Sequence, residues 1–144
     1  MIKHLMIFYL TLLMNLEVLI VIYTGYYAKL KKYENAGLTP IAVSGIIPKF
    51  YTDRYRYMDF APRYSFFKAW KDKEISDSEY ARMYKDYLNT LDKEEIEFDF
   101  KEYNTKEHNC ILICYEKTGD FCHRHILANW LNKNFGYEVK EYVC

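Results

Sequence analysis

The sequence has no excess of charge of either sign, because its 20 Lys and Arg residues balance its 20 Asp and Glu residues. This balance argues against non-specific electrostatic binding of nucleic acid by the whole protein, although a local basic patch is compatible with it. Internal repeats and low-complexity segments are also absent. The 144 residues are enough for one domain with a hydrophobic core of its own.

Cysteine is scarce, with four residues that do not form the paired Cys-x-x-Cys spacing of structural zinc sites. The residues that could offer ligands are Cys114, Cys122, His123 and His125. Cys110 and Cys114 sit in an apolar, strand-like run, which is typical of reduced cysteines and not of a disulfide framework. We therefore expect a cytoplasmic protein with no metal and no cofactor.

The apolar N-terminal stretch MIKHLMIFYLTLLM lacks both a cleavage site and the length of a membrane span. Asn15 and Glu17 interrupt it before it reaches the roughly 20 apolar residues that a spanning helix needs. We expect residues 1–13 to be a dispensable extension, with Met14 as the true start and residues 14–144 as a single domain. A membrane anchor and a secretion signal are the alternatives, and we expect no stable membrane association.

Aromatic residues, in contrast, are abundant, with 16 Tyr, 9 Phe and 2 Trp. Tyrosine buries a ring while keeping a polar tip, so it suits partly open pockets and interfaces as well as cores. An AT-rich genome would enrich the same residue types, so the composition alone does not choose between these explanations.

Short apolar runs rich in β-branched residues predict strands that are buried on both faces, as in parallel sheets. They occupy residues 17–23, 39–45 and 109–116, and the alternating segment 137–143 predicts a last strand near a sheet edge. The helix between the first two strands, closed by Gly37, predicts a right-handed crossover. The predicted fold class is α/β, with a small, mostly parallel, four-stranded Rossmann-like sheet and helices on both faces.

Helical periodicity is clearest in SDSEYARMYKDYLNTL, where Ser76 and Glu79 form a capping box. The tyrosine stripe of this helix is more typical of a packed face than of a cofactor site. Asp92 predicts the N-cap of the next helix, although the alternation of Ile96, Phe98 and Phe100 leaves a strand as the weaker alternative there. Asp120 predicts the N-cap of the last helix. The preceding residues 46–72 form a long connection rich in aromatic and basic side chains, which predicts a functional segment.

Candidate site residues gather where the predicted strands end, because ligands of open parallel sheets bind outside the carboxyl ends of the strands. Small and hydroxylated residues at the first two ends would let a ligand approach the backbone. The candidate ligand-binding residues are Thr24, Tyr26, Ser44, Lys49, Arg63, His123 and Arg124. The candidate catalytic residues are Glu116 and Cys122.

The stretch ICYEKTGDFCHRHILANWL holds the densest chemistry of the chain. With Asp120 as N-cap, Cys122 would lie in the first helical turn, where unpaired N–H groups and the helix dipole favour anions and acidify a thiol. Arg124 would add a forked cation for phosphate or carboxylate. The structural alternative is equally compatible with the sequence: Cys122 is a small packed residue, and Arg124 pairs with Glu116.

The same stretch resembles the signature of the domain-of-unknown-function family 488 (DUF488), which carries a strand, Cys-x-Glu, and then Cys-His-Arg opening a helix. The segments IYTGYYAKLKK, AVSGIIPKFY and APRYSFFKAWKD also resemble its shorter members, so the likeness covers most of residues 18–143. The resemblance implies a small α/β fold and no agreed reaction. The residues that match the family motif are Glu116, Cys122, His123 and Arg124.

Two glycines depart from the pattern that the resemblance implies. Gly25 stands where a Ser is expected after YT, and Gly45 stands where a basic or polar residue often follows the Ser of the second strand. If these positions touch the ligand in the family, this chain binds its ligand differently or more loosely.

Three functional hypotheses follow. The first is a pocket for a phosphate-containing, nucleotide-like ligand. Arg124, the helix start and Lys49 would hold the phosphate, and Tyr26 or an aromatic residue of the segment 50–70 would stack on the base. Glu116 would act as acid and base if the ligand or a glycosidic bond is hydrolysed. The second is a non-catalytic protein that sequesters a small signalling nucleotide or acts as a DNA-associated accessory protein through the aromatic and basic residues 49–70. The third is thiol chemistry at Cys122. It ranks lowest, because no resolving Cys-x-x-Cys exists and His123, its sequence neighbour, would point elsewhere on a helix.

Overall fold

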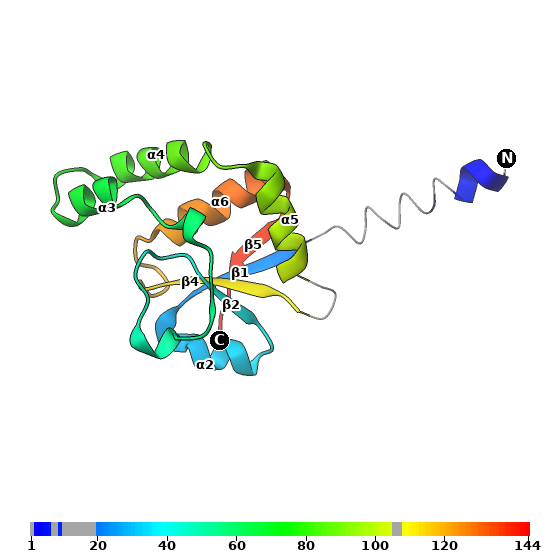
Figure 1. The fold of residues 1–144 in the computed structure, drawn as a ribbon, viewed down its shortest axis with the longest axis horizontal. Coiled ribbons are helices and arrows are strands. Elements are labelled where there is room, and N and C mark those ends of the chain that lie inside the picture. The colour runs from blue at the N-terminus through cyan, green and yellow to red at the C-terminus, as the bar shows by residue number, and fades with distance from the viewer. Residues whose placement is uncertain (1, 7–8, 10–19, 105–107) are drawn as a thin grey trace.

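The computed structural model describes residues 2–6, 9, 20–104 and 108–144 (Figure 1). In this part of the chain, one five-stranded sheet has the order β3-β2-β4-β1-β5, and all neighbouring strands are parallel. The strands are β1 (Val21–Tyr26), β2 (Thr39–Ala42), β3 (Tyr55–Arg56), β4 (Cys110–Cys114) and β5 (Glu138–Glu141). The predicted α/β class with a parallel sheet is confirmed.

The number of strands differs from the prediction, because the sheet has five strands and not four. The additional strand is β3, which consists of two exposed residues and pairs with β2 from within the long connection 46–72. A strand this short has no hydrophobic periodicity by which a sequence could reveal it. The predicted last strand is confirmed as an edge strand, and it pairs with β1.

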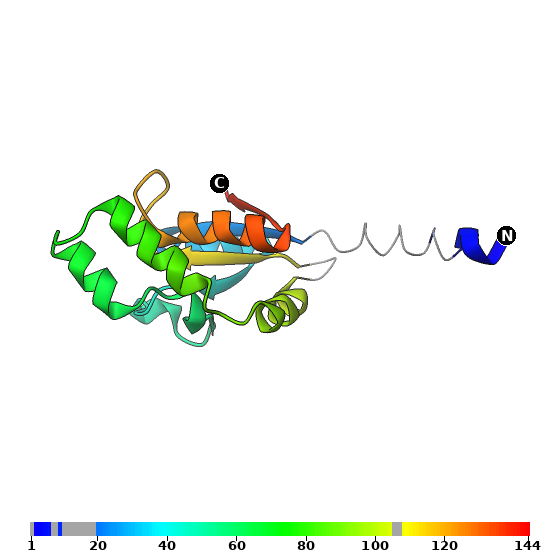
Figure 2. The same cartoon turned by 90° about the horizontal axis from the view of Figure 1, so that it is seen from above.

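Five helices of the described chain surround the sheet. They are α2 (Leu30–Asn35), α3 (Tyr64–Lys71), α4 (Asp77–Leu88), α5 (Lys93–Tyr103) and α6 (His123–Phe135). Three short 3-10 turns, η1 (Tyr27–Lys29), η2 (Lys49–Tyr51) and η3 (Met58–Phe60), complete the connections. Figure 1 shows α2 on one side of the sheet and α4, α5 and α6 on the other. Seen from above, α6 lies along the sheet and α4 lies beside it (Figure 2).

Two apolar cores fill the space between these layers. The side chains of β4 point alternately to the two faces of the sheet and so contribute to both cores. Leu112 and Cys114 join the larger core with α4, α5 and α6, whereas Ile111 and Ile113 join the smaller core with Tyr33 of α2. Successive side chains of a strand point to opposite faces, so a strand covered on both sides reads as a continuous apolar run. The predicted helices on both faces are therefore confirmed.

The helix starts follow the predicted caps in two cases out of three. The Ser76 hydroxyl accepts the N–H of Glu79, and the Asp92 carboxylate caps α5. The prediction for α6 is wrong, because its N-cap is Cys122, in extended backbone with φ −151°, and not Asp120. The backbone N–H of Asp120 instead donates to the carbonyl oxygen of Lys117 in the turn before the helix.

Gly25 has a packing role in this chain. A Cβ atom at this position of β1 would lie 2.5 Å from ring atoms of Tyr33. The Tyr33 side chain is buried, and its hydroxyl oxygen accepts the backbone N–H of Tyr26 at 3.2 Å. The glycine therefore makes room for a ring that fastens α2 to β1.

The N-terminal prediction falls mainly outside the described residues. Residues 2–6 are helical and exposed, whereas the proposed start at Met14 lies in the segment 10–19, which the structure does not describe. Among the helices of the described residues, none combines the length and the apolar character needed to cross a membrane.

Candidate functional site

A cavity of about 610 Å³ opens at the carboxyl ends of β2 and β4. Ser44 and Gly45 line it just after β2, and Tyr115 and Glu116 line it just after β4. This is the edge of the sheet at which ligands of open parallel sheets bind. The volume falls in the range of sites for small molecules and cofactors.

One wall of the cavity is aromatic. Trp70 packs against Tyr80 and Phe121, with ring centroids 5.1 and 5.3 Å apart. The aromatic residues that line the cavity are Tyr64, Phe67, Trp70, Tyr80, Tyr115 and Phe121. Tyr64, Phe67 and Trp70 belong to the segment 50–70, from which a stacking aromatic was expected. Tyr80, Tyr115 and Phe121 were not expected, because aromatic residues at helical spacing also mark ordinary packed faces. Tyr80 serves both purposes, since it is buried in the core and contributes to the wall.

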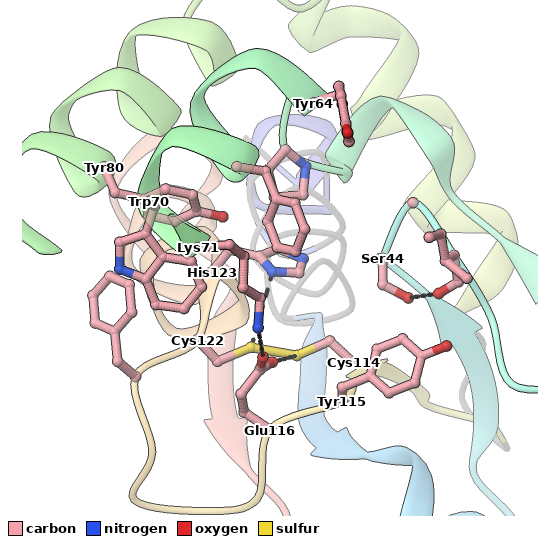
Figure 3. Close-up of a pocket in the computed structure, with 15 residues that line it drawn as sticks. Ser44, Tyr64, Trp70, Lys71, Tyr80, Cys114, Tyr115, Glu116, Cys122 and His123 are labelled. Carbon is pink, nitrogen blue, oxygen red and sulfur yellow. Dashed lines mark hydrogen bonds and ion pairs between the residues drawn. A yellow bond between two sulfur atoms is a disulfide. The ribbon is translucent and has the colours of Figure 1, made fainter. Parts of the chain in front are cut away.

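Cys114 and Cys122 form the part of the cavity shown at the bottom of Figure 3, where the structure joins their sulfur atoms in a disulfide. The expectation of reduced cysteines is therefore wrong for this pair, whereas Cys110 and Cys144 are free. No sequence motif relates Cys114 to Cys122. They meet because β4 ends, and α6 begins, at the same edge of the sheet.

His123 is buried beside the two sulfurs, with its Nε2 atom 2.7 Å from the carbonyl oxygen of Val43. A carbonyl oxygen can only accept, so Nε2 carries the proton. Burial lowers the pKa of His123 to about 4, and the ring is neutral at pH 7. Nδ1 is then a lone-pair nitrogen, and it lies 3.9 Å from the sulfur of Cys122.

The expectation that Cys122 and His123 would point apart is also wrong. They would diverge as neighbours on a helix, but Cys122 lies before the helix in extended backbone. Both side chains consequently line the cavity. The ligand atoms of Cys114, Cys122 and His123 lie within 4.8 Å of one another, which makes these three residues a group that could hold a metal ion.

Glu116 supplies a carboxylate to the cavity wall. Its Oε2 atom lies 3.6 Å from the sulfur of Cys114, and its Oε1 atom lies 3.9 Å from Nζ of Lys71. About a quarter of the Glu116 side chain is exposed (26%), so a ligand in the cavity could reach it. Figure 3 shows Lys71 extending from α3 toward this carboxylate.

Arg124 is fully buried and does not line the cavity. Its Nε and Nη2 atoms donate to the two carboxylate oxygens of Glu141 at 3.2 and 3.1 Å. Nη1 donates to the backbone carbonyl of Glu116 and lies 3.2 Å from the sulfur of Cys114. The alternative pairing of Arg124 with the Glu116 side chain is therefore wrong, because the partner carboxylate belongs to Glu141.

Two more predicted ligand-binding residues sit at strand ends but differ in access. Ser44 lines the cavity, donates its hydroxyl to the carbonyl of Ile46 and accepts the hydroxyl of Tyr27 at 2.6 Å. Burial raises the pKa of Tyr27 to about 12, so it stays protonated. Thr24 does not line the cavity. It is buried in β1 and donates to the Glu141 carboxylate.

The remaining predicted residues also lie outside the cavity lining. The Tyr26 ring packs under the Arg124 guanidinium at 5.9 Å, and Lys49 is exposed in η2. Arg63 lies over the ring of Tyr87, 5.0 Å from its centroid. Arg63 nevertheless occupies the N-cap position of α3, without a capping hydrogen bond from its side chain, and directly precedes Tyr64 at the cavity.

The aromatic and basic segment 49–70 serves packing to a large extent. Tyr51, Tyr57 and Phe60 are buried, and Arg54 forms a bidentate pair with the Glu34 carboxylate. The large apolar side chains of this segment that stay exposed are Phe50, Tyr55, Met58 and Tyr64.

Comparison with known protein families gives a match over most of the chain. The sequence model of the DUF488-N3a family, described as the active DUF488-N3 subclade, matches residues 35–135, which is more than two thirds of the chain. The matched range runs from the end of α2 to the end of α6 and includes all residues that line the cavity. No curated protein and no solved structure shows significant similarity to the chain.

Proposed function

The chain belongs to the DUF488-N3a family, the active DUF488-N3 subclade, and we propose that its cavity binds and hydrolyses a small, phosphate-containing, nucleotide-like ligand. The observation that carries this proposal is the aromatic cavity at the carboxyl ends of β2 and β4, with the Glu116 carboxylate in its wall. An aromatic wall and a reachable carboxylate match the two parts of such a ligand, its base and its reactive linkage.

The base stacks on the aromatic wall. Trp70 and Phe121 present neighbouring rings to the cavity, and Tyr64 is an exposed ring in the same lining. Stacking of a base on an aromatic side chain contributes about 1–3 kcal/mol and tolerates different bases. The wall therefore favours a nucleotide-like ligand without selecting one base.

The phosphate is held by groups other than Arg124, whose guanidinium is engaged with Glu141. Lys71 lines the cavity with half of its side chain exposed (51%), and Nη2 of Arg56 donates to the Gly45 carbonyl at the cavity edge. A Cβ atom at Gly45 would meet nothing within 4 Å, so the backbone there is open to a ligand. The start of α6, which has no side-chain cap, adds N–H groups nearby.

Glu116 carries the chemical part of the proposal. As a general base it takes a proton from the attacking water, and as a general acid it returns the proton to the leaving oxygen of a phosphate ester or a glycosidic bond. Nζ of Lys71, 3.9 Å away, keeps the carboxylate oriented toward the cavity. When the ligand binds, Lys71 turns to its phosphate.

The test of the chemistry is the variant Glu116→Gln, which keeps the shape of the side chain and removes its base. Turnover of nucleoside phosphates and dinucleotides, followed by chromatography, should fall by about 10²–10⁴-fold. Binding should persist. Glu102→Gln, on the exposed side of α5, is the matched control and should leave turnover unchanged. Unchanged turnover in Glu116→Gln would contradict the catalytic role.

The test of binding is a thermal-shift screen of the same compounds, with short single-stranded DNA as a further arm. A rise in melting temperature with a nucleotide, lost in Trp70→Ala, supports the stacking site. A rise without any turnover favours the non-catalytic, sequestering alternative. A salt-dependent rise with DNA alone favours the accessory protein that uses residues 49–70. Absence of a shift with all compounds overturns the proposal.

A further inference from the structure

We propose that the reduced chain binds a divalent transition-metal ion of the zinc type through the sulfurs of Cys114 and Cys122 and the Nδ1 atom of His123. The three ligand atoms lie within 4.8 Å of one another, and all three residues are buried at the cavity. Thiolate and imidazole are the ligands that zinc prefers in proteins. This site does not depend on the nucleotide-like ligand proposed above.

One of the three ligand–ligand distances already suits a shared ion, and reduction frees the two bonded sulfurs to separate around it. Metal–ligand bonds of about 2.0–2.3 Å at tetrahedral angles place two ligand atoms about 3.3–3.8 Å apart. Nδ1 of His123 lies 3.9 Å from the sulfur of Cys122, so a small adjustment brings both atoms to one ion. Because Cys122 precedes the helix and His123 begins it, the two neighbours converge on the cavity.

The backbone spacing of the two cysteines points the same way. Their Cα atoms lie 7.8 Å apart, whereas a disulfide usually joins Cα atoms about 4.4–6.8 Å apart. A metal ion between two thiolates needs a wider spacing, because two bonds of about 2.3 Å replace one sulfur–sulfur bond. The ends of β4 and α6 are therefore held at a distance that suits two thiolates on one ion.

The imidazole is already oriented as a ligand. A metal-bound histidine usually donates its other ring N–H to a carbonyl or carboxylate, which sets the tautomer and the ring plane. His123 does this through Nε2 and the Val43 carbonyl at 2.7 Å. The ring of Tyr84 meets it edge-on, with centroids 5.5 Å apart. These contacts leave Nδ1 for the ion.

Charge and access complete the site. Nη1 of Arg124 lies 3.2 Å from the sulfur of Cys114, where its positive charge favours a thiolate. Three protein ligands leave a fourth position, and because all three residues line the cavity, that position faces it. Such an open position is typical of catalytic zinc sites and not of closed structural ones. A water bound there would lie near Glu116. Any use of that water in catalysis rests on the proposed hydrolysis.

Loading of the metal begins with reduction of the Cys114–Cys122 bond. A phosphine supplies the two electrons and takes an oxygen atom from water to become the phosphine oxide, and the two sulfurs take the two protons of that water to become thiols. Binding of one divalent ion then displaces both thiol protons to solvent. Loading therefore needs reduced protein and becomes stronger as the pH rises.

The experiment is an anaerobic titration of the full, phosphine-reduced chain with Co²⁺, without any nucleotide. One equivalent should give thiolate-to-cobalt charge transfer in the near ultraviolet and the strong visible bands of tetrahedral cobalt, and Zn²⁺ should displace it. Cys114→Ser and Cys122→Ser should each weaken Co²⁺ binding by at least about 10–100-fold, because mutation of a residue that only hydrogen-bonds to a metal ligand already causes a loss of this size. Cys144→Ser and His125→Gln are matched controls and should bind as the wild type does.

A second measurement needs no variant. Zn²⁺ should slow the alkylation of Cys114 and Cys122 in the reduced wild-type chain, mapped by mass spectrometry, and should leave exposed Cys144 reactive. Equal alkylation of the pair with and without Zn²⁺ overturns the proposal. So does a cobalt spectrum without the thiolate band, or a band that persists unchanged in both serine variants. Because no nucleotide is present, these outcomes leave the proposed hydrolysis to its own test.

Discussion

Arg124 and Glu141 form a bidentate ion pair in which the guanidinium is fully buried, with N–O distances of 3.2 and 3.1 Å. The pair ties the first turn of α6 to the end of the edge strand β5. Thr24 of β1 donates to the same carboxylate, so three elements meet at one side chain. The arginine that the sequence suggested for anion binding thus holds the edge of the sheet.

Removal of this arginine should destabilise the fold strongly. In Arg124→Ala the carboxylate of Glu141, only 17% exposed, loses the guanidinium that pairs with it and keeps the neutral Thr24 hydroxyl as a donor, and breaking a buried ion pair in this way costs about 3–5 kcal/mol. Urea unfolding followed by circular dichroism measures the loss. Arg82→Ala removes an exposed pair with Asp86 and should cost less than about 1 kcal/mol. Equal losses in the two variants would contradict the structural role of Arg124.

The buried His123 should make stability depend on pH. Its pKa of about 4 in the folded chain lies below the ordinary value of 6.5, so the unfolded chain binds the proton more readily in this window. The contribution of His123 is therefore fully present above pH 6.5 and is lost as the pH falls toward about 4. The loss amounts to a few kcal/mol at most, at about 1.4 kcal/mol per pKa unit.

Urea unfolding between pH of about 7 and 4.5, with a chelator present, tests this dependence. His123→Gln should flatten the decline in unfolding free energy, whereas His4→Gln, at an exposed position, should reproduce the wild-type decline. A decline of the same steepness in His123→Gln would show that other groups cause it.

Gly25 should not tolerate a side chain. In Gly25→Ala the new Cβ atom would overlap the buried Tyr33 ring at 2.5 Å, and such overpacking costs about 1–3 kcal/mol. Gly45→Ala is the matched control, because a Cβ there meets nothing within 4 Å, and its change should stay within about 0.5 kcal/mol. Thermal or urea unfolding compares the two. A Gly25→Ala variant as stable as the wild type would show that Tyr33 can move aside.

The capping box of α4 should be measurable by itself. Ser76→Ala removes the hydroxyl that accepts the Glu79 N–H at 3.2 Å, and loss of such a cap costs about 1 kcal/mol. Ser78→Ala, at an exposed position that is the second residue of α4, should change the unfolding free energy much less. If the two variants lose equal amounts, the cap is not what stabilises this end of α4.

Most of the regular structure could be predicted because its causes are local. A run such as CILIC of β4 is apolar at every position, which is enough to identify a strand covered on both faces. Ser76 and Asp92 mark helix starts because a short oxygen side chain reaches the free N–H groups of the first turn. The start of α6 was misjudged because Asp120 has a capping side chain but its backbone belongs to a turn.

The site was predicted at the correct edge of the sheet but with an incomplete set of residues. Strand order and polarity place Ser44 and Glu116 at the carboxyl ends, so both could be predicted to lie there. A stacking aromatic from the segment 50–70 could be expected, and α3 supplies it. The contribution of Tyr80 from α4 could not, since helical aromatic stripes look alike whether they face a core or a cavity. Lys71 gave no signal of its own among the many lysines of the chain.

The sequence by itself determined the α/β class, the buried strands, two helix caps and the cluster of reactive residues, because each depends on side chains that are close along the chain. Only the tertiary structure decided that Arg124 pairs with Glu141 and that Cys114 meets Cys122 and His123. These partners come from different elements, and their contact depends on how α6 and β5 dock on the sheet. Packing between distant segments, which no local pattern encodes, therefore separates the structural arginine from the residues that face the cavity.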